Sequence, residues 1–274
     1  MNKYLVIGDP IDHSLSPTIH NYWIKKNNIK AIYDKERLNS DDLKNLIIKV
    51  RERNISGVNV TVPFKKKVIP YLDKLTLGAE ATQSVNTIIL NDDNKIVGYN
   101  TDIGGFENAI KYTKYDISGK KIFILGSGGV TPSIIFALYK MNVSSITITN
   151  RTKKKAEYLQ NFFNSNTVKK RGWNDIKLVD WGEIPDFDMI INATSVGLNS
   201  DDNLDLDFSK IGKNKFFYDV IYNPKETNFL KKGKELGNKT ENGKKMFIFQ
   251  AAEAFKIWHD IQPEINEEVS KLLD

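Results

Sequence analysis

A short apolar run that ends in a glycine turn constrains the fold of this chain most. Residues 121–125 read KIFIL, Gly126-Ser127-Gly128-Gly129 follow, and an apolar stretch then runs to about Met141. Strand, glycine turn and helix in this order are typical of a parallel α/β sheet, where the turn brings a pyrophosphate close to backbone amides at a helix N-terminus. The pattern predicts a nucleotide site, although many parallel α/β proteins carry such a turn without binding a nucleotide.

Strand and helix patterns keep alternating after the glycine turn. Apolar runs predict strands at 145–149, 188–193 and 216–220, and amphipathic stretches predict helices at 153–163 and 228–236. Near-continuous apolar strands separated by helices are typical of a buried parallel sheet. We therefore expect residues 104–244 to form a doubly wound, Rossmann-type domain.

The first hundred residues predict a second α/β domain. Strands are expected at 3–8, 31–38 and 58–62, helices at 17–27, at 40–53 with Ser40 as its cap and near 66–72, and a hairpin at 85–91 and 95–100 around the turn Asn91-Asp92-Asp93-Asn94. Two further helices, 247–260 and 263–273, are expected to return to this domain. It would then be a discontinuous mixed-sheet domain of residues 1–103 and 245–274, so the chain is α/β with two domains.

The charge and composition exclude several classes of protein. The net charge is +6, but the basic residues form short scattered clusters, namely Lys65-Lys66-Lys67, Lys153-Lys154-Lys155, Lys169-Lys170-Arg171 and Lys231-Lys232. Solvated surface explains them better than a nucleic-acid site, and a basic protein suits an anionic substrate and a phosphorylated cofactor. No apolar run approaches the roughly 18 residues of a membrane span. The absence of cysteine excludes disulfides, thiolate metal sites and a cysteine nucleophile, so we expect a cytoplasmic protein without a metal site.

The segment after the second strand of the nucleotide domain indicates which cofactor binds. A site for NAD normally has Asp or Glu about 20 residues beyond the glycines, where it binds the ribose 2′-hydroxyl. Here the strand ends in Asn150-Arg151-Thr152-Lys153-Lys154-Lys155, without a carboxylate. Guanidinium, hydroxyl and ammonium groups favour a 2′-phosphate, and hence NADP. The alternative is a solvated lysine cluster, although cations at a helix start oppose the helix dipole.

Polar side chains alternate with valines in GVNVTVPFK, residues 57–65. Asn59 and Thr61 lie at alternate positions between Val58, Val60 and Val62, and Pro63 ends the strand. Such side chains aim hydrogen-bonding groups one way, as a polyhydroxylated ligand requires. An ordinary edge strand with a polar outer face would have the same pattern.

In these motifs the chain resembles the shikimate dehydrogenase family, NADP-dependent enzymes of the shikimate pathway. The resemblance spans nearly the whole length, through Ser14-Leu15-Ser16-Pro17, Asn59 to Lys65, Ser84-Val85-Asn86-Thr87, Asn100-Thr101-Asp102, the glycine turn, Asn150-Arg151-Thr152, Asn192-Ala193-Thr194-Ser195, Tyr222-Asn223-Pro224 and Gln250-Ala251-Ala252. It implies reversible reduction of 3-dehydroshikimate to shikimate by hydride from NADPH. The implied partners are a small-molecule substrate and NADP, in a monomer or homodimer.

The resemblance also implies the roles of individual residues. Lys65 and Asp102 would be the catalytic pair: Lys65 polarises the carbonyl and supplies a proton, and Asp102 orients the amine and the substrate hydroxyl. A surface ion pair is the alternative. The implied substrate-binding residues are Ser14 and Ser16 at the carboxylate, where plain helix capping is the alternative, Asn59, Thr61, Asn86 and Gln250 at ring hydroxyls, and Tyr222 near substrate and nicotinamide. The implied cofactor-binding residues are Gly126, Ser127, Gly128, Gly129, Val130, Asn150, Arg151, Thr152, Lys155, Thr194, Val220 and Gly243.

Three segments depart from the usual pattern of the family. Gln83-Ser84 replace a common Gly-Ala, Val130-Thr131-Pro132 replace small residues at the start of the helix, and Lys244-Lys245 replace an apolar residue before Met246. None of these removes a catalytic group. Two other functions stay open at this point: a quinate/shikimate dehydrogenase that uses NAD or NADP, and a catalytically silent ligand-binding relative.

Overall fold

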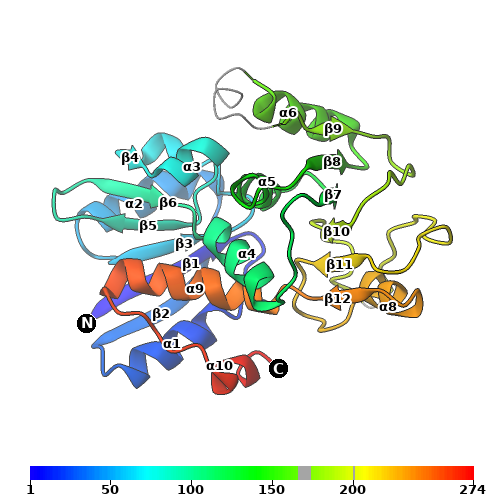
Figure 1. Cartoon of the computed structure of the whole chain (residues 1–274). Coiled ribbons are helices and arrows are strands. Elements are labelled where there is room, and N and C mark those ends of the chain that lie inside the picture. Colours follow the sequence, from blue (N-terminus) through cyan, green and yellow to red (C-terminus); the bar gives the residue numbers. More distant parts are fainter. Residues whose placement is uncertain (166–173, 200) are drawn as a thin grey trace. The chain divides into compact units, whose positions relative to one another are not determined.

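The computed structural model describes residues 1–165, 174–199 and 201–274, so the predicted basic cluster at 169–171 lies outside the described residues. The chain forms two compact units, residues 1–106 with 248–274 and residues 107–247. It passes from one to the other inside helix α4 (Thr101–Tyr112) and back inside helix α9 (Lys244–His259), both labelled in Figure 1. None of the described helices is long and apolar enough to cross a membrane.

The first unit contains a mixed sheet with strand order β2-β1-β3-β5-β6-β4. The strands are β1 (Asn2–Gly8), β2 (Ala31–Arg37), β3 (Gly57–Val60), β4 (Lys74–Leu75), β5 (Thr87–Leu90) and β6 (Ile96–Tyr99). Strands β1, β2 and β3 are parallel, whereas β5 runs antiparallel to both β3 and β6. The expected hairpin is β5 and β6, and the expectation of a mixed sheet is confirmed.

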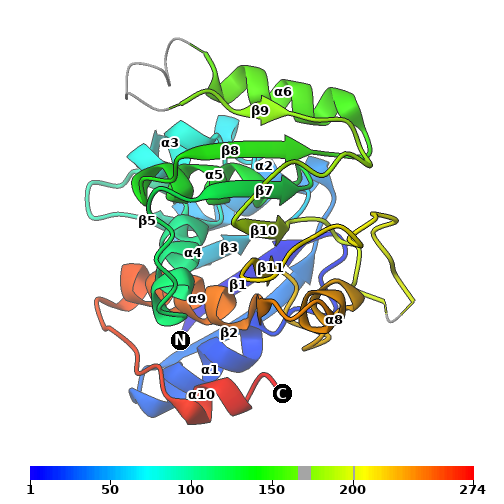
Figure 2. The same cartoon turned by 45° about the vertical axis from the view of Figure 1, so that its right-hand side comes forward.

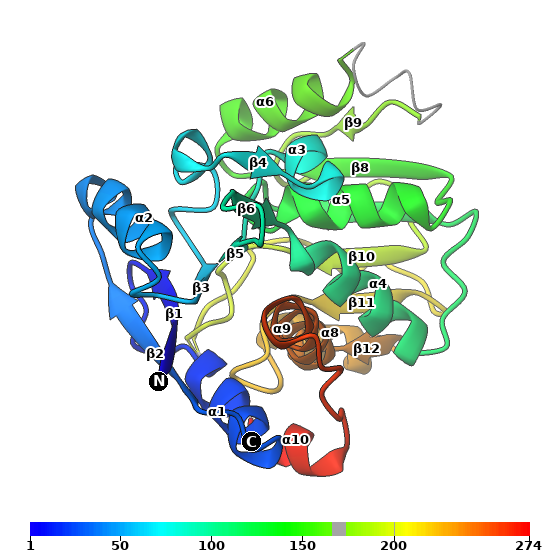
Figure 3. The same cartoon turned by 90° about the vertical axis from the view of Figure 1, so that its left-hand side faces the viewer.

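Alternation along β1 directs side chains to two different layers of the first unit. Leu5 and Ile7 pack with helix α2 (Leu43–Arg51) in one apolar cluster, while the ring of Tyr4 lies 5.0 Å from that of Trp258 on α9. Helix α1 (Ser16–Lys26) contributes to this second, aromatic layer, and the short helix α10 (Glu267–Lys271) follows α9. Figure 3 shows α2 and α9 on opposite sides of the sheet.

Several boundaries in the first unit differ from those that the sequence predicts. Ser40 is not the cap: Asn39 caps the 3-10 turn Ser40–Asp42 that precedes α2, and its backbone N–H donates to Asp42 Oδ2 at 3.0 Å. Only Ile69–Tyr71 forms a 3-10 turn where a helix at 66–72 was expected, because Pro70 removes a backbone donor. Helix α3 (Leu77–Thr82) and helix α4 were not predicted: α3 has only six residues, and in α4 the helical spacing of Ile103, Phe106 and Ile110 was missed beside Gly104 and Gly105.

The second unit contains an entirely parallel sheet with strand order β12-β11-β10-β7-β8-β9. The strands are β7 (Lys121–Leu125), β8 (Ser145–Thr149), β9 (Lys177–Leu178), β10 (Met189–Asn192), β11 (Phe216–Asp219) and β12 (Lys239–Glu241). The expected doubly wound fold is confirmed. Strands β9 and β12 were not predicted, because two- and three-residue edge strands with charged residues give little periodic signal.

Helices cover both faces of the second sheet. Helix α8 (Asn228–Glu235) packs Phe229 and Leu230 against Phe123 and Phe217. Helix α5 (Thr131–Lys140), which is buried over most of its length, lies on the other face, alongside β7 and β8 (Figure 2). Helix α6 (Lys153–Phe163) follows β8. The carboxyl ends of β7, β8 and β10 therefore lie at one edge of the sheet, where doubly wound folds bind nucleotides.

Candidate active site

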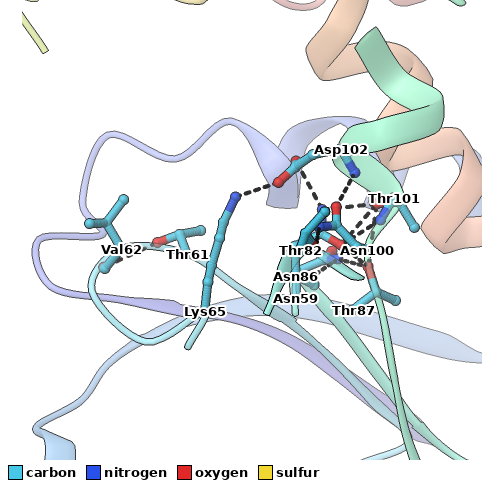
Figure 4. A network of polar contacts seen from close by, with 10 residues as sticks. All are labelled: Asn59, Thr61, Val62, Lys65, Thr82, Asn86, Thr87, Asn100, Thr101 and Asp102. Carbon is cyan, nitrogen blue, oxygen red and sulfur yellow. Dashed lines mark hydrogen bonds and ion pairs between the residues drawn. The ribbon is translucent and has the colours of Figure 1, made fainter. Parts of the chain in front are cut away.

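Lys65 and Asp102 form a largely buried ion pair in the first unit (Figure 4). Lys65 lies in the turn after β3, and Asp102 lies in the first turn of α4. The Nζ–Oδ2 distance is 2.5 Å, and the side chains are 14% and 9% exposed. Removing both charges from water costs more than a surface pair gains, so the pair is poorly explained as a stabilising surface contact.

Asn86 fixes the other oxygen of Asp102. Its Nδ2 donates to Asp102 Oδ1 at 3.0 Å and to Thr101 Oγ1 at 2.9 Å. Its Oδ1 accepts from the backbone N–H of Thr101 at 2.8 Å and from the hydroxyl of Thr87 at 3.1 Å. Both amide hydrogens and both lone pairs of Asn86 therefore have partners within the protein.

Both side-chain amide hydrogens of Asn59 are also used in hydrogen bonds within the protein. Its Nδ2 donates to the Asn86 carbonyl and to Thr87 Oγ1, both at 3.0 Å, and its Oδ1 accepts from the Tyr33 hydroxyl at 2.6 Å. Strand β3 lies between β1 and β5, and all four of its residues are buried. The alternative of an edge strand with a polar outer face is therefore wrong.

The start of α4 is set by the side chain of Asn100. Its Oδ1 accepts from the backbone N–H of Asp102 at 3.1 Å, which is the bond that an N-cap residue makes. Its Nδ2 donates to Thr82 Oγ1 at 2.9 Å, which ties α4 to the end of α3. The tripeptide Asn100-Thr101-Asp102 thus places the carboxylate by capping the helix that carries it.

Ser14, Ser16 and Thr61 lie in loops or at a helix start of the same unit. The expected strand 58–62 ends at Val60, so Thr61 lies beyond it, half-buried, with only a 3.5 Å contact from its hydroxyl to the Val62 carbonyl. Ser14 Oγ accepts from the backbone N–H of Ser16 at 3.3 Å, a local bond at the start of α1, whose N-cap position is Leu15. Ser16 is buried.

Two predicted substrate residues lie elsewhere along the chain. Gln250 is half-buried on the part of α9 that belongs to the first unit. Tyr222 follows β11 in the second unit, where its ring stacks on Phe247 at 4.6 Å.

The glycine turn of the second unit leaves no space for side chains at its first position. Gly126 has φ +104°, and a Cβ there would lie 2.8 Å from Thr194 and 3.0 Å from the Ala193 backbone. Thr131, which replaces the usual small residue, is fully buried, and its hydroxyl donates to the Gly126 carbonyl at 3.2 Å. The larger side chain therefore closes the turn from inside. A hydroxyl oxygen at this turn, Ser127 Oγ, is buried and has no partner among the described residues.

Asn150 connects the glycine turn to the segment that follows β8. Its Oδ1 accepts from the backbone N–H of Ser127 at 3.2 Å, and its Nδ2 donates to the Thr152 carbonyl at 2.9 Å. Lys153 pairs with Asp180 at 2.6 Å. Arg151 and Lys155 are exposed, and no acidic partner is found for them in the part of the chain that the structure describes. Unpaired cations beside a tight glycine turn fit a phosphorylated dinucleotide.

The remaining predicted cofactor residues lie on the same sheet edge. Thr194 follows β10 and faces Gly126, as given above. Gly243 packs directly on the backbone of Val220, so a Cβ at 243 would clash with the Val220 carbonyl. Its N–H donates to the Ile221 carbonyl at 3.0 Å. Gly128, Gly129 and Val130 complete the turn, and the first two are exposed.

Comparison with known proteins identifies the family. A model of the shikimate dehydrogenase substrate binding domain matches residues 6–88, and a model of shikimate / quinate 5-dehydrogenase matches residues 107–221. A shikimate dehydrogenase (NADP(+)) of Pelagibacter ubique is 52% identical over 271 residues, 99% of this chain and 98% of the relative. The chain belongs to the shikimate dehydrogenase family.

Solved structures of the family agree with this assignment. A crystal structure of a shikimate dehydrogenase in complex with NADP+ has a TM-score of 0.92 at 34% identity, covering 100% of this chain and 94% of that one. The Thermus thermophilus enzyme in complex with NADP(H) and shikimate has a TM-score of 0.87 at 27% identity, covering 100% and 98%. The activity is therefore that of an NADP-dependent shikimate dehydrogenase, an oxidoreductase of the shikimate pathway and of aromatic amino acid biosynthesis.

One departure from the family pattern has a physical explanation in the backbone. Gln83 ends α3 with φ +48° and ψ 42°, in the left-handed region that glycine adopts at little cost. Its Nε2 donates to the Glu80 carbonyl at 2.9 Å, which offsets part of the strain. Lys245, in another departure, lies over the ring of Tyr112 at 4.3 Å from the centroid.

Sequence reasoning did not select four residues that hold this site together. Thr87, Thr101 and Asn100 lie inside the quoted motifs, so their adjacency to Asn86 and Asp102 was a usable signal. Tyr33 lies in β2, far from any motif, and nothing in the sequence connects it to Asn59.

Proposed function

We propose that the first unit binds shikimate or 3-dehydroshikimate and that Lys65 and Asp102 carry out the proton transfer of the reaction. The second unit, residues 107–247, would bind NADP. The observation that supports this most is the Lys65–Asp102 pair, which is 2.5 Å long, largely buried and held by Asn86 from the far side of the carboxylate. The match of the substrate binding domain model to residues 6–88 supports the same division.

Lys65 supplies the proton when the ketone is reduced. NADP, in its reduced form, supplies the hydride that the carbonyl carbon accepts. The Lys65 ammonium donates a proton to the carbonyl oxygen as negative charge develops there, and in the reverse direction the neutral amine accepts the proton of the hydroxyl. One Nζ hydrogen points to Asp102, which leaves two donors for the substrate.

Asp102 orients Lys65 and accepts from a substrate hydroxyl. Because Asn86 holds Oδ1 and Lys65 holds Oδ2, the carboxylate cannot rotate, and each oxygen keeps a lone pair for a ligand. Asn86 itself has no donor left, so in this role it contributes by fixing Asp102. Within the described residues the Thr61 hydroxyl makes a single contact, 3.5 Å long, so it keeps its donor for a ring hydroxyl.

The remaining substrate roles follow the family resemblance. Among the described residues Ser14 Oγ accepts only from the backbone N–H of Ser16, so its hydroxyl hydrogen is available for the substrate carboxylate. Ser16 would bind at the same end, and Asn59 would face a ring hydroxyl. Gln250 would bind a ring hydroxyl, and Tyr222 would lie near substrate and nicotinamide.

The NADP roles follow the family resemblance and the geometry of the second unit. Gly126, Ser127, Gly128, Gly129 and Val130 would form the turn against which the pyrophosphate binds, and Thr194, Val220 and Gly243 would line the same edge. Arg151, Thr152 and Lys155 would bind the 2′-phosphate, and Asn150 would hold their segment against the glycine turn.

A steady-state assay at the nicotinamide absorbance band tests the proposal. Shikimate and quinate would each be offered with NADP and with NAD. We expect shikimate with NADP to have the highest kcat/KM of the four pairs. Equal turnover of quinate, or a preference for NAD, would support the quinate/shikimate dehydrogenase alternative. No turnover with any pair would support the silent relative.

Two further properties stay predictions. The cytoplasmic location rests on the absence of cysteine and can be tested by cell fractionation. Light scattering coupled to size exclusion would decide between monomer and homodimer.

A further inference from the structure

Tyr33 joins the polar network of the first unit through Asn59. It belongs to β2 and is 2% exposed. Its hydroxyl donates to Asn59 Oδ1 at 2.6 Å, and Asn59 in turn donates to the Asn86 carbonyl and to Thr87 Oγ1, both at 3.0 Å. Tyr33 therefore lies directly behind a residue that sequence reasoning assigned to the substrate.

A phenol has one hydrogen, and here it goes to Asn59 Oδ1. This contact fixes which end of the Asn59 amide faces Tyr33, because only the amide oxygen can accept from the phenol. The two amide hydrogens of Asn59 are thereby directed to the Asn86 carbonyl and to Thr87 Oγ1. Burial raises the pKa of Tyr33, so the phenol keeps the hydrogen that this bond needs.

Tyr33 is held through its backbone by Asn21 and through one face of its ring by His20. Asn21 on α1 donates to the Tyr33 carbonyl at 2.7 Å and accepts from the Tyr33 N–H at 2.9 Å, which pairs the open edge of β2 at this residue. The imidazole of His20 lies parallel to the ring, with centroids 4.2 Å apart and planes 2° apart.

His20 contributes an uncharged aromatic ring to this stack. Neither ring nitrogen has a hydrogen-bond partner within the described chain, and Trp23 and Trp258 pack against the same ring. Burial, and then the proximity of His259, lower its pKa to about 3. The imidazole is therefore uncharged across the physiological range and contributes contact rather than charge.

We propose that Tyr33, held by the His20 stack and by Asn21, is a positioning residue that sets the Asn59 amide for a ring hydroxyl of the substrate. The inference rests on the proposed function. Tyr33 is buried and does not need to touch the ligand. It acts by fixing which way the Asn59 amide faces and by satisfying Asn59 Oδ1, which would otherwise be a buried acceptor without a donor.

Tyr33→Phe tests this directly, because it removes the hydroxyl and retains the stacked ring. We expect the KM for shikimate to rise about tenfold, the equivalent of one lost hydrogen bond, with kcat and the KM for NADP within about a factor of three of wild type. A structural role alone would lower the stability without separating these constants.

Tyr4→Phe is the matched control. Tyr4 is the register partner of Tyr33 on β1, is equally buried, and packs on Trp258 and His259, but no hydrogen bond of its hydroxyl is found among the described residues. It should leave the KM for shikimate unchanged. If Tyr33→Phe behaves as Tyr4→Phe does while wild type turns over shikimate, the inference is overturned and the proposed function stands.

A double-mutant cycle with Asn59→Ala tests the route of the effect. If Tyr33 acts through Asn59, the double variant should raise the KM by clearly less than the product of the two single effects. Independent, multiplicative effects would overturn the route through Asn59. Absence of shikimate turnover in wild type would instead contradict the proposed function, so the two failures can be told apart.

Discussion

Two buried aspartates, one in each unit, have opposite surroundings. Asp102 is 6% exposed and Asp219, at the end of β11, is fully buried. Asp102 has a cation beside it, since Lys65 donates to Oδ2. Asp219 accepts only from neutral groups, namely the Asn192 amide, the Thr227 hydroxyl at 2.7 Å and the Ile221 N–H at 3.0 Å.

The surroundings of each carboxylate match a different task. Burial raises the pKa of Asp219 to about 6, although its hydrogen bonds oppose the change. These bonds brace three elements, because Asn192 ends β10 and Thr227 caps α8 through the Leu230 N–H. Asp219 is thus a structural brace whose charge is tolerated. Asp102 lies next to an amine that can exchange a proton, which is what a reacting site requires.

The largest effect is expected from a substitution that removes the cation beside Asp102. Lys65→Ala should lower kcat by roughly 10²–10⁴ with a much smaller change in the KM for shikimate, because the proton donor acts in the transition state. Lys66→Ala, at the exposed neighbouring position, is the control and should keep the wild-type kcat. Turnover of Lys65→Ala within a factor of a few of wild type would remove Lys65 from the chemistry.

The next largest effect concerns the pH dependence of stability that comes from Asp219, the aspartate without a neighbouring cation. The folded-state pKa of Asp219, about 6, lies above its ordinary 3.8, so the native state keeps a proton that the unfolded state has lost. The stability from this group is present below about pH 4 and is lost as the pH rises through about 6. Each pKa unit corresponds to about 1.4 kcal/mol, so the loss is on the order of 3 kcal/mol.

Asp219→Asn isolates that contribution. Urea unfolding of both proteins near pH 4 and pH 7 should give a stability difference, wild type minus variant, that falls as the pH rises. Any constant cost of placing an amide among donors cancels in this comparison. A difference that does not change with pH would mean that Asp219 does not titrate in this range.

A third experiment compares paired and unpaired cations at the cofactor end. Arg151→Ala should raise the KM for NADP about tenfold or more and leave the KM for NAD nearly unchanged, because a charge-assisted bond to the 2′-phosphate is lost. Lys153→Ala is the matched control, since Lys153 already pairs with Asp180. Equal changes for both cofactors would show that Arg151 does not read the 2′-phosphate.

The smallest expected effect lies in the backbone that precedes Asn86. Gln83→Gly relieves a left-handed conformation that costs a non-glycine residue about 1 kcal/mol or more, offset by the greater freedom of glycine when unfolded. We expect a net gain of about 0.5 kcal/mol in urea unfolding. Gln83→Ala should instead lose stability, because it keeps the strain and loses the bond to Glu80.

The success of the sequence predictions followed the strength of each local signal. Strands 121–125 and 145–149 and helix 153–163 were predicted to the residue, since they are apolar or clearly periodic and bounded by turns. The strand containing Asn59 was predicted too long, because the chain leaves the sheet before Pro63 for reasons of tertiary packing. Tyr33 carried no signal at all.

The amino-acid sequence alone determined the two α/β folds, the family, the preference for NADP and the chemical groups at the site, because these depend on local periodicity and on residue types at fixed spacing. The tertiary structure decided which of those groups are free to act. Hydrogen-bond partners of a side chain come from residues far apart in the chain, so Asn86 is fully occupied, Lys153 is paired and Arg151 is unpaired only once the chain is folded.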